Sequence, residues 1–185
     1  MKNYKVLKNK KFSYGDYNLV PLRDRDKFVI MKWRNEQIDF LRQGKILTEK
    51  DQLNYFKKTI SKLYNQTFPN QLLFSLIKEN ICIGYGGLVH INWNDKNAEI
   101  SFIMDTELEK KYFKEIWAVF LKMLDLIAFN ELYFNKIYTY AYDLRPLLYD
   151  VLEDSGYIKE AVLKNHFEFK SDLKDIVIHS KFNKS

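Results

Sequence analysis

One amphipathic segment between two strand-like segments constrains the fold of this chain more than any other feature. Apolar side chains recur at positions 113, 116, 117, 120, 121, 124, 127 and 128, which is the spacing of a helix with one buried face. Residues 98–104 before it and 135–141 after it are rich in β-branched and aromatic residues, as strands are. A helix that connects two neighbouring strands of one sheet makes them parallel, so we predict a parallel pair here.

The other segments add strands that we expect to pair antiparallel. Residues 73–104 hold three strand-like runs separated by turn-forming residues at 79–80 and 92–97, which is typical of a meander. Thr48 with Asp51 three residues later is close to a capping box, and Pro146 and Gly156 suit the first turn and the cap of a further helix. We therefore predict an α+β fold with a mixed, mostly antiparallel sheet of about seven strands. The expected strands are 17–22, 73–77, 81–91, 98–104, 135–141, 157–169 and 174–182, and the expected helices are 24–40, 48–63, 113–128 and 146–155.

The length and composition suit one folded domain. The 185 residues are 46% hydrophobic and 29% charged with only 6 glycines, which excludes a disordered chain. We expect residues 1–16 to be a basic N-terminal lead-in and residues 17–185 to be a single domain. No apolar run follows the first lysines, so we expect a cytoplasmic protein. The longest apolar stretch, 116–129, contains Lys122 and Asp125 and is shorter than a membrane-spanning helix, so we expect no membrane partner.

Charge and cysteine usage narrow the classes of ligand. Thirty Lys and Arg against 24 Asp and Glu give a net charge of +6, which mildly favours an anionic ligand such as a nucleotide or a phosphorylated cofactor, although solubility explains it as well. The lone Cys82 lies in an apolar segment and shares no ligand spacing with the three histidines, so we expect no metal. The aromatic residues fall on the helical stripe and in the strands, where burial explains them, and we expect no nucleic-acid partner.

The order of elements and four stretches of sequence resemble the GNAT N-acetyltransferase superfamily over nearly the whole chain. Three of them are AEISFIMD (98–105), AFNELYFNKIYTYAYD (128–143) and SGYIKEAVLKNHFEF (155–169). They are similar to the branch that acetylates ribosomal-protein N-termini and nucleotide-linked amino sugars. The fourth, MKWRNEQ (31–37), resembles the acceptor-side helix of its amino-sugar acetyltransferases. The resemblance implies helices on both faces of the sheet and acetyl-CoA as the co-substrate.

The resemblance also implies where the donor binds. Its backbone contacts fall on Phe102, Ile103 and Met104, in a strand that is expected to splay from its parallel neighbour. The glycine-bearing pyrophosphate loop of the family, R/Q-x-x-G-x-G/A, is replaced by the glycine-free stretch ELEKKYFKEIW at 107–117. Lysines near the start of the following helix are expected to hold the donor's phosphates, with Arg145 as a further contact, and a solvated basic turn is the alternative. These lysines are Lys110, Lys111 and Lys114.

Two side chains are candidates for proton transfer. Strand alternation puts Glu99 on the face shared with Ser101 and Ile103, where burial would raise the pKa of a carboxylate and let it accept the ammonium proton. The alternative is a solvated Glu99 paired with a lysine. Where the family usually has a tyrosine that protonates the leaving thiolate, this sequence has Leu152, and the nearest tyrosine is Tyr149, one helical turn earlier.

Two short motifs are candidates for binding the acceptor. Trp33, Arg34 and Asn35 place a stacking surface, an anion clamp and an amide within one helical turn. Such a set suits a nucleotide-linked sugar or a carboxylate, although each residue is also an ordinary surface or half-buried residue. Tyr85 and Gly86 stand in a strand interrupted by two glycines, which indicates a bulge or close contact with another group.

These observations together predict an acyl-CoA-dependent N-acetyltransferase that acts by direct transfer on the primary amine of a small acceptor, with Glu99 as general base. The resemblance of residues 31–37 favours an amino sugar attached to a nucleotide over a protein N-terminus. A non-catalytic GNAT-like binding module is the other interpretation, because of the glycine-free loop and Leu152. We expect a monomer or a homodimer.

Overall fold

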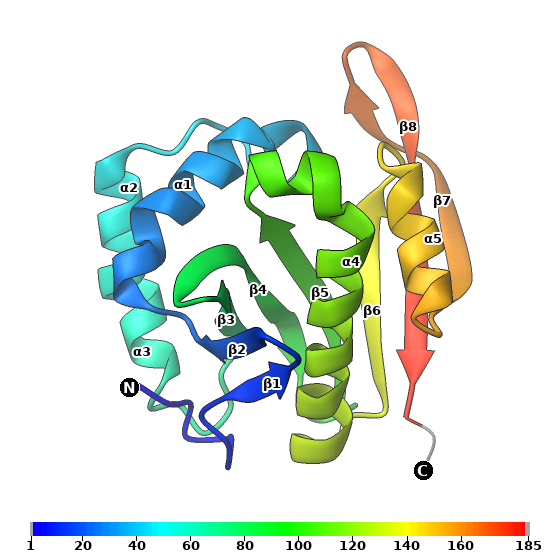
Figure 1. Ribbon diagram of the computed structural model, residues 1–185. Helices are drawn as coiled ribbons and strands as arrows, with labels where there is room; N and C mark the ends of the chain where they lie inside the picture. Colours follow the sequence, from blue (N-terminus) through cyan, green and yellow to red (C-terminus); the bar gives the residue numbers. More distant parts are fainter. Residues whose placement is uncertain (1, 184–185) are drawn as a thin grey trace.

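Figure 1 shows the computed structural model of the chain, which describes residues 2–183. Its centre is one eight-stranded sheet in the order β1-β2-β3-β4-β5-β6-β8-β7. The strands are β1 (Phe12–Tyr14), β2 (Tyr17–Pro21), β3 (Leu72–Lys78), β4 (Ile81–Asn92), β5 (Asn97–Met104), β6 (Lys136–Tyr142), β7 (Ile158–Phe169) and β8 (Asp172–Phe182). The α-helices are α1 (Lys27–Glu36), α2 (Glu49–Tyr55), α3 (Ser61–Leu63), α4 (Thr106–Asp125) and α5 (Pro146–Asp154). The expected α+β class with a mixed, mostly antiparallel sheet is confirmed.

The pairing of β5 with β6 is parallel, as the crossover helix predicts. Every other pair of neighbouring strands in the described part of the chain is antiparallel. Only three residue pairs join β5 to β6, and the last of them is Glu99 with Tyr138. Beyond Glu99 the two strands separate, although β5 stays paired with β4 as far as Met104. The sheet therefore splits in its middle.

Helices pack on both faces of the sheet because its strands are apolar on both sides. Phe102 stacks on Phe120 of α4 with 3.9 Å between ring centroids and meets the edge of Trp117 at 4.9 Å. Side chains that neighbour Phe102 along β5 point to the opposite face. On that face the hydroxyl of Tyr85 accepts a hydrogen bond from Arg34 of α1 at 3.4 Å. The sheet is thus a layer between α4 and the α1–α2 pair.

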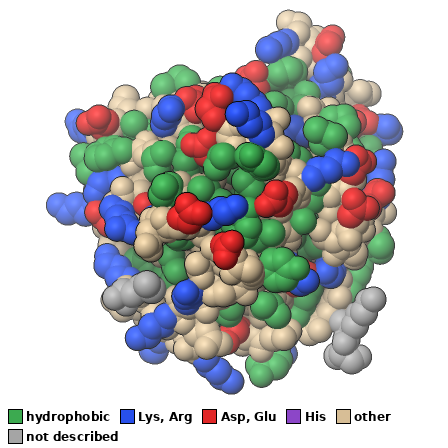
Figure 2. All heavy atoms as spheres, in the orientation of Figure 1, with side chains coloured by type: hydrophobic (Ala, Val, Ile, Leu, Met, Phe, Trp, Pro, Cys, Tyr) green, Lys and Arg blue, Asp and Glu red, His purple; other side chains and the backbone are tan. Residues whose placement is uncertain are grey.

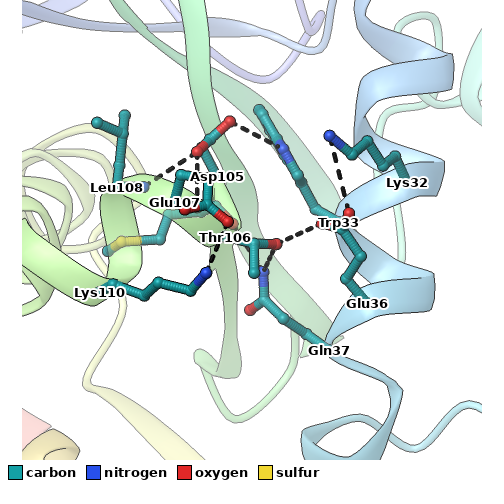
Figure 3. Close-up of polar contacts among 10 residues, drawn as sticks. Lys32, Trp33, Glu36, Gln37, Asp105, Thr106, Glu107, Leu108 and Lys110 are labelled. Atoms are coloured by element: carbon teal, nitrogen blue, oxygen red, sulfur yellow. Dashed lines mark hydrogen bonds and ion pairs between the residues drawn. The ribbon is translucent and has the colours of Figure 1, made fainter.

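The long helix differs from its expected range, because it starts directly after β5 rather than at residue 113. Asp105 caps it and accepts hydrogen bonds from the amides of Glu107 and Leu108 at 2.9 and 3.0 Å (Figure 3). Tyr112 interrupts the helical geometry with φ −128° and ψ 24°. The helix is therefore kinked there, about one and a half turns after its start. A short π-helix, Leu126–Glu131, extends the other end.

The first residues of the chain pack against the domain. Tyr4 is fully buried, stacks on Tyr64 and donates its hydroxyl to the carbonyl of Leu73 at 2.6 Å. Residues 12–14 form β1 at one edge of the sheet, which adds the eighth strand. The segment that we expected to be a lead-in is therefore part of the folded structure from Tyr4 onward.

The excess of positive charge is spread over the visible surface. Figure 2 shows acidic and basic side chains interspersed on the face that Figure 1 presents, with no extended area of one sign. Within residues 2–183, no helix is both long and apolar enough to cross a membrane.

Candidate active site

The split between β5 and β6 opens a cavity of about 380 Å³. Its lining comes from both faces of the sheet, since it includes Tyr85 on the α1 side and Trp117 of α4 on the other. The cavity therefore passes through the sheet where the two strands part. The ionisable residues with Arg, His, Asp or Glu side chains among its lining are Arg34, Arg42, His90, Glu99 and Arg145.

Glu99 lies at the last residue pair before the split and is only 5% exposed. Its carboxylate forms an ion pair with Arg42 and lies 3.9 Å from Nε2 of His90. Burial raises the pKa of Glu99 above its ordinary value, while Arg42 and His90 oppose that rise. A buried carboxylate with a raised pKa beside a cavity is suited to proton transfer near neutral pH.

The backbone of β5 offers hydrogen-bonding groups to the same opening. The amide of Asp105 donates to Ile83 of β4, so by alternation the amide of Ile103 also faces β4 and those of Phe102 and Met104 face the split. Of the three expected donor contacts, two thus point into the opening. The carbonyl of Met104 accepts a hydrogen bond from the side chain of Gln37 at 2.8 Å.

Arg145 lines the cavity, but its guanidinium is engaged with protein groups. It forms an ion pair with Glu109 of α4 at 3.0 Å, donates to Gln37 at 3.1 Å and lies 3.7 Å from the centre of the Phe40 ring. Burial lowers the pKa of Arg145 and raises that of Glu109. In this state, Arg145, Glu109 and Gln37 form a latch between the start of α4 and the α1–α2 connection, which we call the Gln37 latch.

The three residues of the acceptor motif face different surroundings. Trp33 is 1% exposed and its indole donates to Asp105 at 3.2 Å, so it fixes the cap of α4 (Figure 3). Asn35 holds the α1–α2 connection, because its side chain donates to the carbonyl of Leu47 and accepts from the amide of the same residue. Arg34 lines the cavity. The helix turns only the middle residue of the motif toward the opening.

Tyr85 lines the cavity as well, whereas Gly86 serves the packing of the strands. A Cβ on Gly86 would lie 2.1 Å from the carbonyl oxygen of Ser101, so only glycine allows β4 and β5 to approach this closely. The pairing around Tyr85 and Gly86 is regular, and the bulge between β3 and β4 lies nearer the start of β4, at Ile83.

The three lysines lie on the surface of the first turns of α4. Lys110 pairs with Glu107 at 2.7 Å, and Lys114 pairs with Asp150 of α5 at 2.9 Å. Among the described residues, no ion pair involves Lys111. A shallow hollow lined by all three lysines and by Tyr112 lies at the kink of α4.

Tyr149 lies outside the lining of the cavity. Its hydroxyl donates to Asp143 at 2.8 Å, and its ring stacks on His179 of β8 with 5.2 Å between centroids. Burial raises the pKa of Tyr149 first, and the bond to Asp143 raises it further. Leu152, at the position where the family usually has tyrosine, is fully buried.

Sequence reasoning missed Arg42 and Gln37. Both follow α1 in an irregular connection, and nothing in the local sequence places them against β5. The guanidinium of Arg42 lies 4.9 Å from the Tyr140 ring and pairs with Glu99, so two separate segments of the sheet hold it. Within the described residues, no group of three or more His, Cys, Asp or Glu side chains could hold a metal ion.

The sheet splits beside a buried carboxylate, between a long helix and a helix pair, which is the arrangement that the resemblance to acetyltransferases implies. A family model described as "Acetyltransferase (GNAT) domain" matches residues 19–178, so the chain belongs to the GNAT acetyltransferase family. The expected enzyme class, an N-acetyltransferase, is confirmed at the level of the family. No curated protein matches the chain at a significant level.

Solved structures show the same fold at low sequence identity. Spermidine N-acetyltransferase from Vibrio cholerae in complex with CoA and spermine is similar with a TM-score of 0.80 and 17% identity, over 92% of this chain and 97% of that one. The dodecameric structure of spermidine N-acetyltransferase from the same organism, in an intermediate state, has a TM-score of 0.73 and 22% identity, over 91% and 95% of the two chains. These structures support the fold of the present chain.

Proposed function

We propose that this protein is an acyl-CoA-dependent N-acetyltransferase that moves an acetyl group to the primary amine of a small acceptor, with Glu99 as general base. The observation that carries the proposal is the position of Glu99, which is buried at the point where β5 and β6 separate and lines the cavity. The similar Vibrio cholerae enzyme was solved with CoA and spermine, which supports acetyl-CoA as donor and a small amine as acceptor.

The residues at the split can divide the work of the transfer. The amides of Phe102 and Met104 face the opening and can hold the amide groups and thioester carbonyl of the donor. Glu99 takes a proton from the acceptor ammonium, and the neutral nitrogen attacks the thioester carbon to form a tetrahedral intermediate. The bond from carbon to sulfur then breaks, the nitrogen gives its second proton to solvent, and the thiolate leaves and gains a proton. Tyr149 stays our candidate for returning a proton to the thiolate, and this role requires its hydroxyl to leave Asp143.

The donor's phosphates are proposed to lie at the start of α4. Lys110, Lys111 and Lys114 line the hollow at the kink, and their positive charges favour an anion there. Arg145 would have to exchange Glu109 for a phosphate to contribute.

The acceptor is proposed to be an amino sugar, attached to a nucleotide in the form that the resemblance of residues 31–37 favours. A protein N-terminus is the alternative acceptor. A non-catalytic binding module has a specific observation in its favour as well, because Gln37 of the Gln37 latch already occupies the carbonyl of Met104.

Binding and turnover of acetyl-CoA test the proposal. Acetyl-CoA at a hundred times its dissociation constant should stabilise the fold by about 2.7 kcal/mol in thermal unfolding, and NAD and ATP should stabilise it less. Release of free CoA in the presence of primary amines then separates an enzyme from a binding module. Absence of any shift at millimolar acetyl-CoA or a longer acyl-CoA would contradict the proposal, and a shift without turnover of any amine would support the module.

A further inference from the structure

The charges around the cavity are unevenly matched. Three arginines line it against a single carboxylate, that of Glu99. Arg42 is paired with Glu99 and Arg145 with Glu109. For Arg34, no ion pair is formed with any residue between 2 and 183. The cavity therefore presents one guanidinium without a protein counter-charge.

Neutral groups hold this guanidinium in a fixed direction. Nε of Arg34 donates to the side chain of Gln43 at 3.0 Å, and Nη1 donates to the hydroxyl of Tyr85 at 3.4 Å. Gln43 is itself held by Asn35, which accepts a hydrogen bond from its amide at 3.1 Å. Nη2 makes no hydrogen bond to the described protein, and it is left open for a ligand. An arginine oriented in advance loses little side-chain entropy when it binds a carboxylate or a phosphate.

The same charges disfavour a polycationic acceptor. Each further ammonium group of a polyamine would lie near arginines, and the one carboxylate of the lining is already paired with Arg42. An acceptor with one amine and one anionic group matches the charges of the cavity. Glu99 can accept the proton of the amine, and Arg34 can bind the anionic group.

The positions of the two residues set the spacing between these groups. Tyr85, which holds Arg34, is paired with Ile103, whereas Glu99 lies four residues earlier in the same strand. This separation is about 13 Å between backbone positions. An α-amino acid is therefore too short, and several bonds must lie between amine and anion.

We infer that the acceptor carries a carboxylate or phosphate several bonds from its amine, and that Arg34 binds this anion. The inference deepens the proposed acetyl transfer and rests on it for the role of the amine. It gives Arg34 the role of setting specificity, and it distinguishes this chain from a polyamine acetyltransferase.

The test uses two matched pairs of amines that differ in an anionic group. Glucosamine 6-phosphate is compared with glucosamine, and 6-aminohexanoate with 6-aminohexanamide, first by calorimetric titration of the full chain without a donor. The anionic member of at least one pair should bind about tenfold more tightly than the neutral member. A preference in the glucosamine pair indicates a phosphate as the anionic group, and a preference in the 6-aminohexanoate pair indicates a carboxylate. In turnover with acetyl-CoA the same member should have the lower KM, and spermidine should be the poorer acceptor.

Variants of Arg34 decide whether this residue binds the anionic group of the acceptor. Arg34→Gln should remove the preference by raising the Kd and KM of the anionic member about tenfold, and Arg34→Lys should keep part of it. Arg25→Gln removes the same charge from an exposed position outside the cavity and should keep the full preference.

Three outcomes would overturn the inference: equal binding within both pairs, spermidine as the preferred ligand, or an undiminished preference in Arg34→Gln. A different result would contradict the proposed acetyltransferase function. If acetyl-CoA neither stabilises the fold nor is consumed, the acetyltransferase proposal fails, while the titrations without donor still decide the anion site.

Discussion

At the scale of single residues, two opposing effects act on the carboxylate of Glu99. Burial raises its pKa above the ordinary value of 4.5, and the positive charge of Arg42 lowers it. A pKa raised in the folded state means that the fold binds the proton more tightly than the unfolded chain does. The stability of the fold therefore falls as the pH rises through the raised pKa. At higher pH the folded state contains the ionised carboxylate of Glu99, which stabilises it less than the protonated form does.

We predict that Glu99→Gln lowers kcat/KM about a hundredfold at neutral pH and leaves acetyl-CoA affinity nearly unchanged, because the amide keeps the size and cannot accept a proton. The melting temperature should be equal to or above that of the wild type at neutral pH, because Arg42 is 44% exposed and tolerates the loss of its partner. Steady-state kinetics and calorimetry measure these effects.

The pH profile of kcat/KM provides a second measurement on the same residue. In the wild type, activity should rise with pH through a midpoint above 4.5, and Arg42→Gln should move this midpoint to higher pH because Arg42 opposes the rise of the pKa. Glu168→Gln, at an exposed position on β7, is the matched control and should behave as the wild type. Wild-type turnover by Glu99→Gln across the neutral range would make Glu99 a structural residue.

The Gln37 latch gives a prediction about stability. Arg145→Met leaves the buried carboxylate of Glu109 without its counter-charge, so the free energy of unfolding should fall by about 3 kcal/mol at neutral pH. The loss should shrink as the pH falls toward 4.5, since a protonated Glu109 no longer carries a buried charge.

Denaturant unfolding at several pH values measures this dependence. The double variant Arg145→Met with Glu109→Gln is the control, and it should recover most of the stability at neutral pH. A deficit of the same size at all pH values would show that the arginine acts through packing on Phe40 instead.

At the scale of elements, the residues proposed to hold the donor's phosphates lie in helical turns at the start of α4. Asp105 caps the helix, Trp33 fixes Asp105, and the side chains of Glu36 and Gln37 both contact Thr106 (Figure 3). Most amides that a phosphate loop would expose are therefore used inside the helix. Side-chain charge is then the means left for attracting the phosphates of the donor.

We predict that replacing Lys110, Lys111 and Lys114 with glutamine weakens acetyl-CoA binding and flattens its dependence on salt. Each lysine that pairs with a phosphate supplies about 1 kcal/mol of screened attraction, which glutamine cannot provide. Two of the lysines already have carboxylate partners, so we expect Lys111→Gln alone to reproduce a large share of the effect.

Calorimetric titration at low and high salt measures both quantities. The exposed residues Lys57, Lys58 and Lys62, outside the hollow and the cavity, provide a triple variant with the same change in net charge. Equal loss of affinity in this control would mean that the net charge of the whole protein attracts the donor. An unchanged salt slope in the α4 variant would leave the phosphates to the backbone.

At the scale of the whole molecule, the N-terminal segment closes the core on the side away from the split. Tyr4 makes two hydrogen bonds with Leu73, one to its carbonyl at 2.6 Å and one from its amide at 3.0 Å. The carbonyl of Leu73 also accepts a hydrogen bond from the amide of Leu22 at 3.0 Å, whereas the amide of Leu73 lies beyond the last residue pair of β2 and β3 and bonds to Tyr4. Burial raises the pKa of Tyr4 strongly, so its hydroxyl stays neutral and can serve as both donor and acceptor.

We predict that Tyr4→Phe lowers the free energy of unfolding by about 1 to 3 kcal/mol, because it leaves the buried amide of Leu73 without a partner and removes one of the two hydrogen bonds to its carbonyl. Equilibrium denaturation in urea measures the change. Tyr14→Phe, at an exposed position, is the control and should have a small effect. No loss of stability in Tyr4→Phe would show that water replaces the hydroxyl.

The order of the elements followed from local patterns. The stripe from position 113 to 128 identified the crossover helix, and with it the single parallel pair of the described sheet. Alternation in β5 placed Glu99 on the same face as Ser101, which also lines the cavity. The family followed from the resemblance, whose motifs lie on strands and helices that the structure contains.

The pairing of Glu99 with Arg42 could not be predicted, because Arg42 belongs to the connection after α1. Residues 37–43 have no repeating pattern, and their path is set by packing against β5, α4 and α5. The face that α1 turns to the sheet was equally undetermined, since polar and apolar residues mix around the helix. As a result, Trp33 became a core residue and Arg34 a lining residue of the cavity.

The sequence by itself thus determined seven of the eight strands and the position of the crossover helix, because a period of two or 3.6 residues depends only on neighbours along the chain, whereas it gave no sign of β1. The tertiary structure alone decided which charges meet in the cavity. Arg42 and Glu99 are 57 residues apart and Arg145 and Gln37 are 108 apart, and such pairs form only when the sheet and helices have packed. The chemistry of the site is a product of those distant contacts.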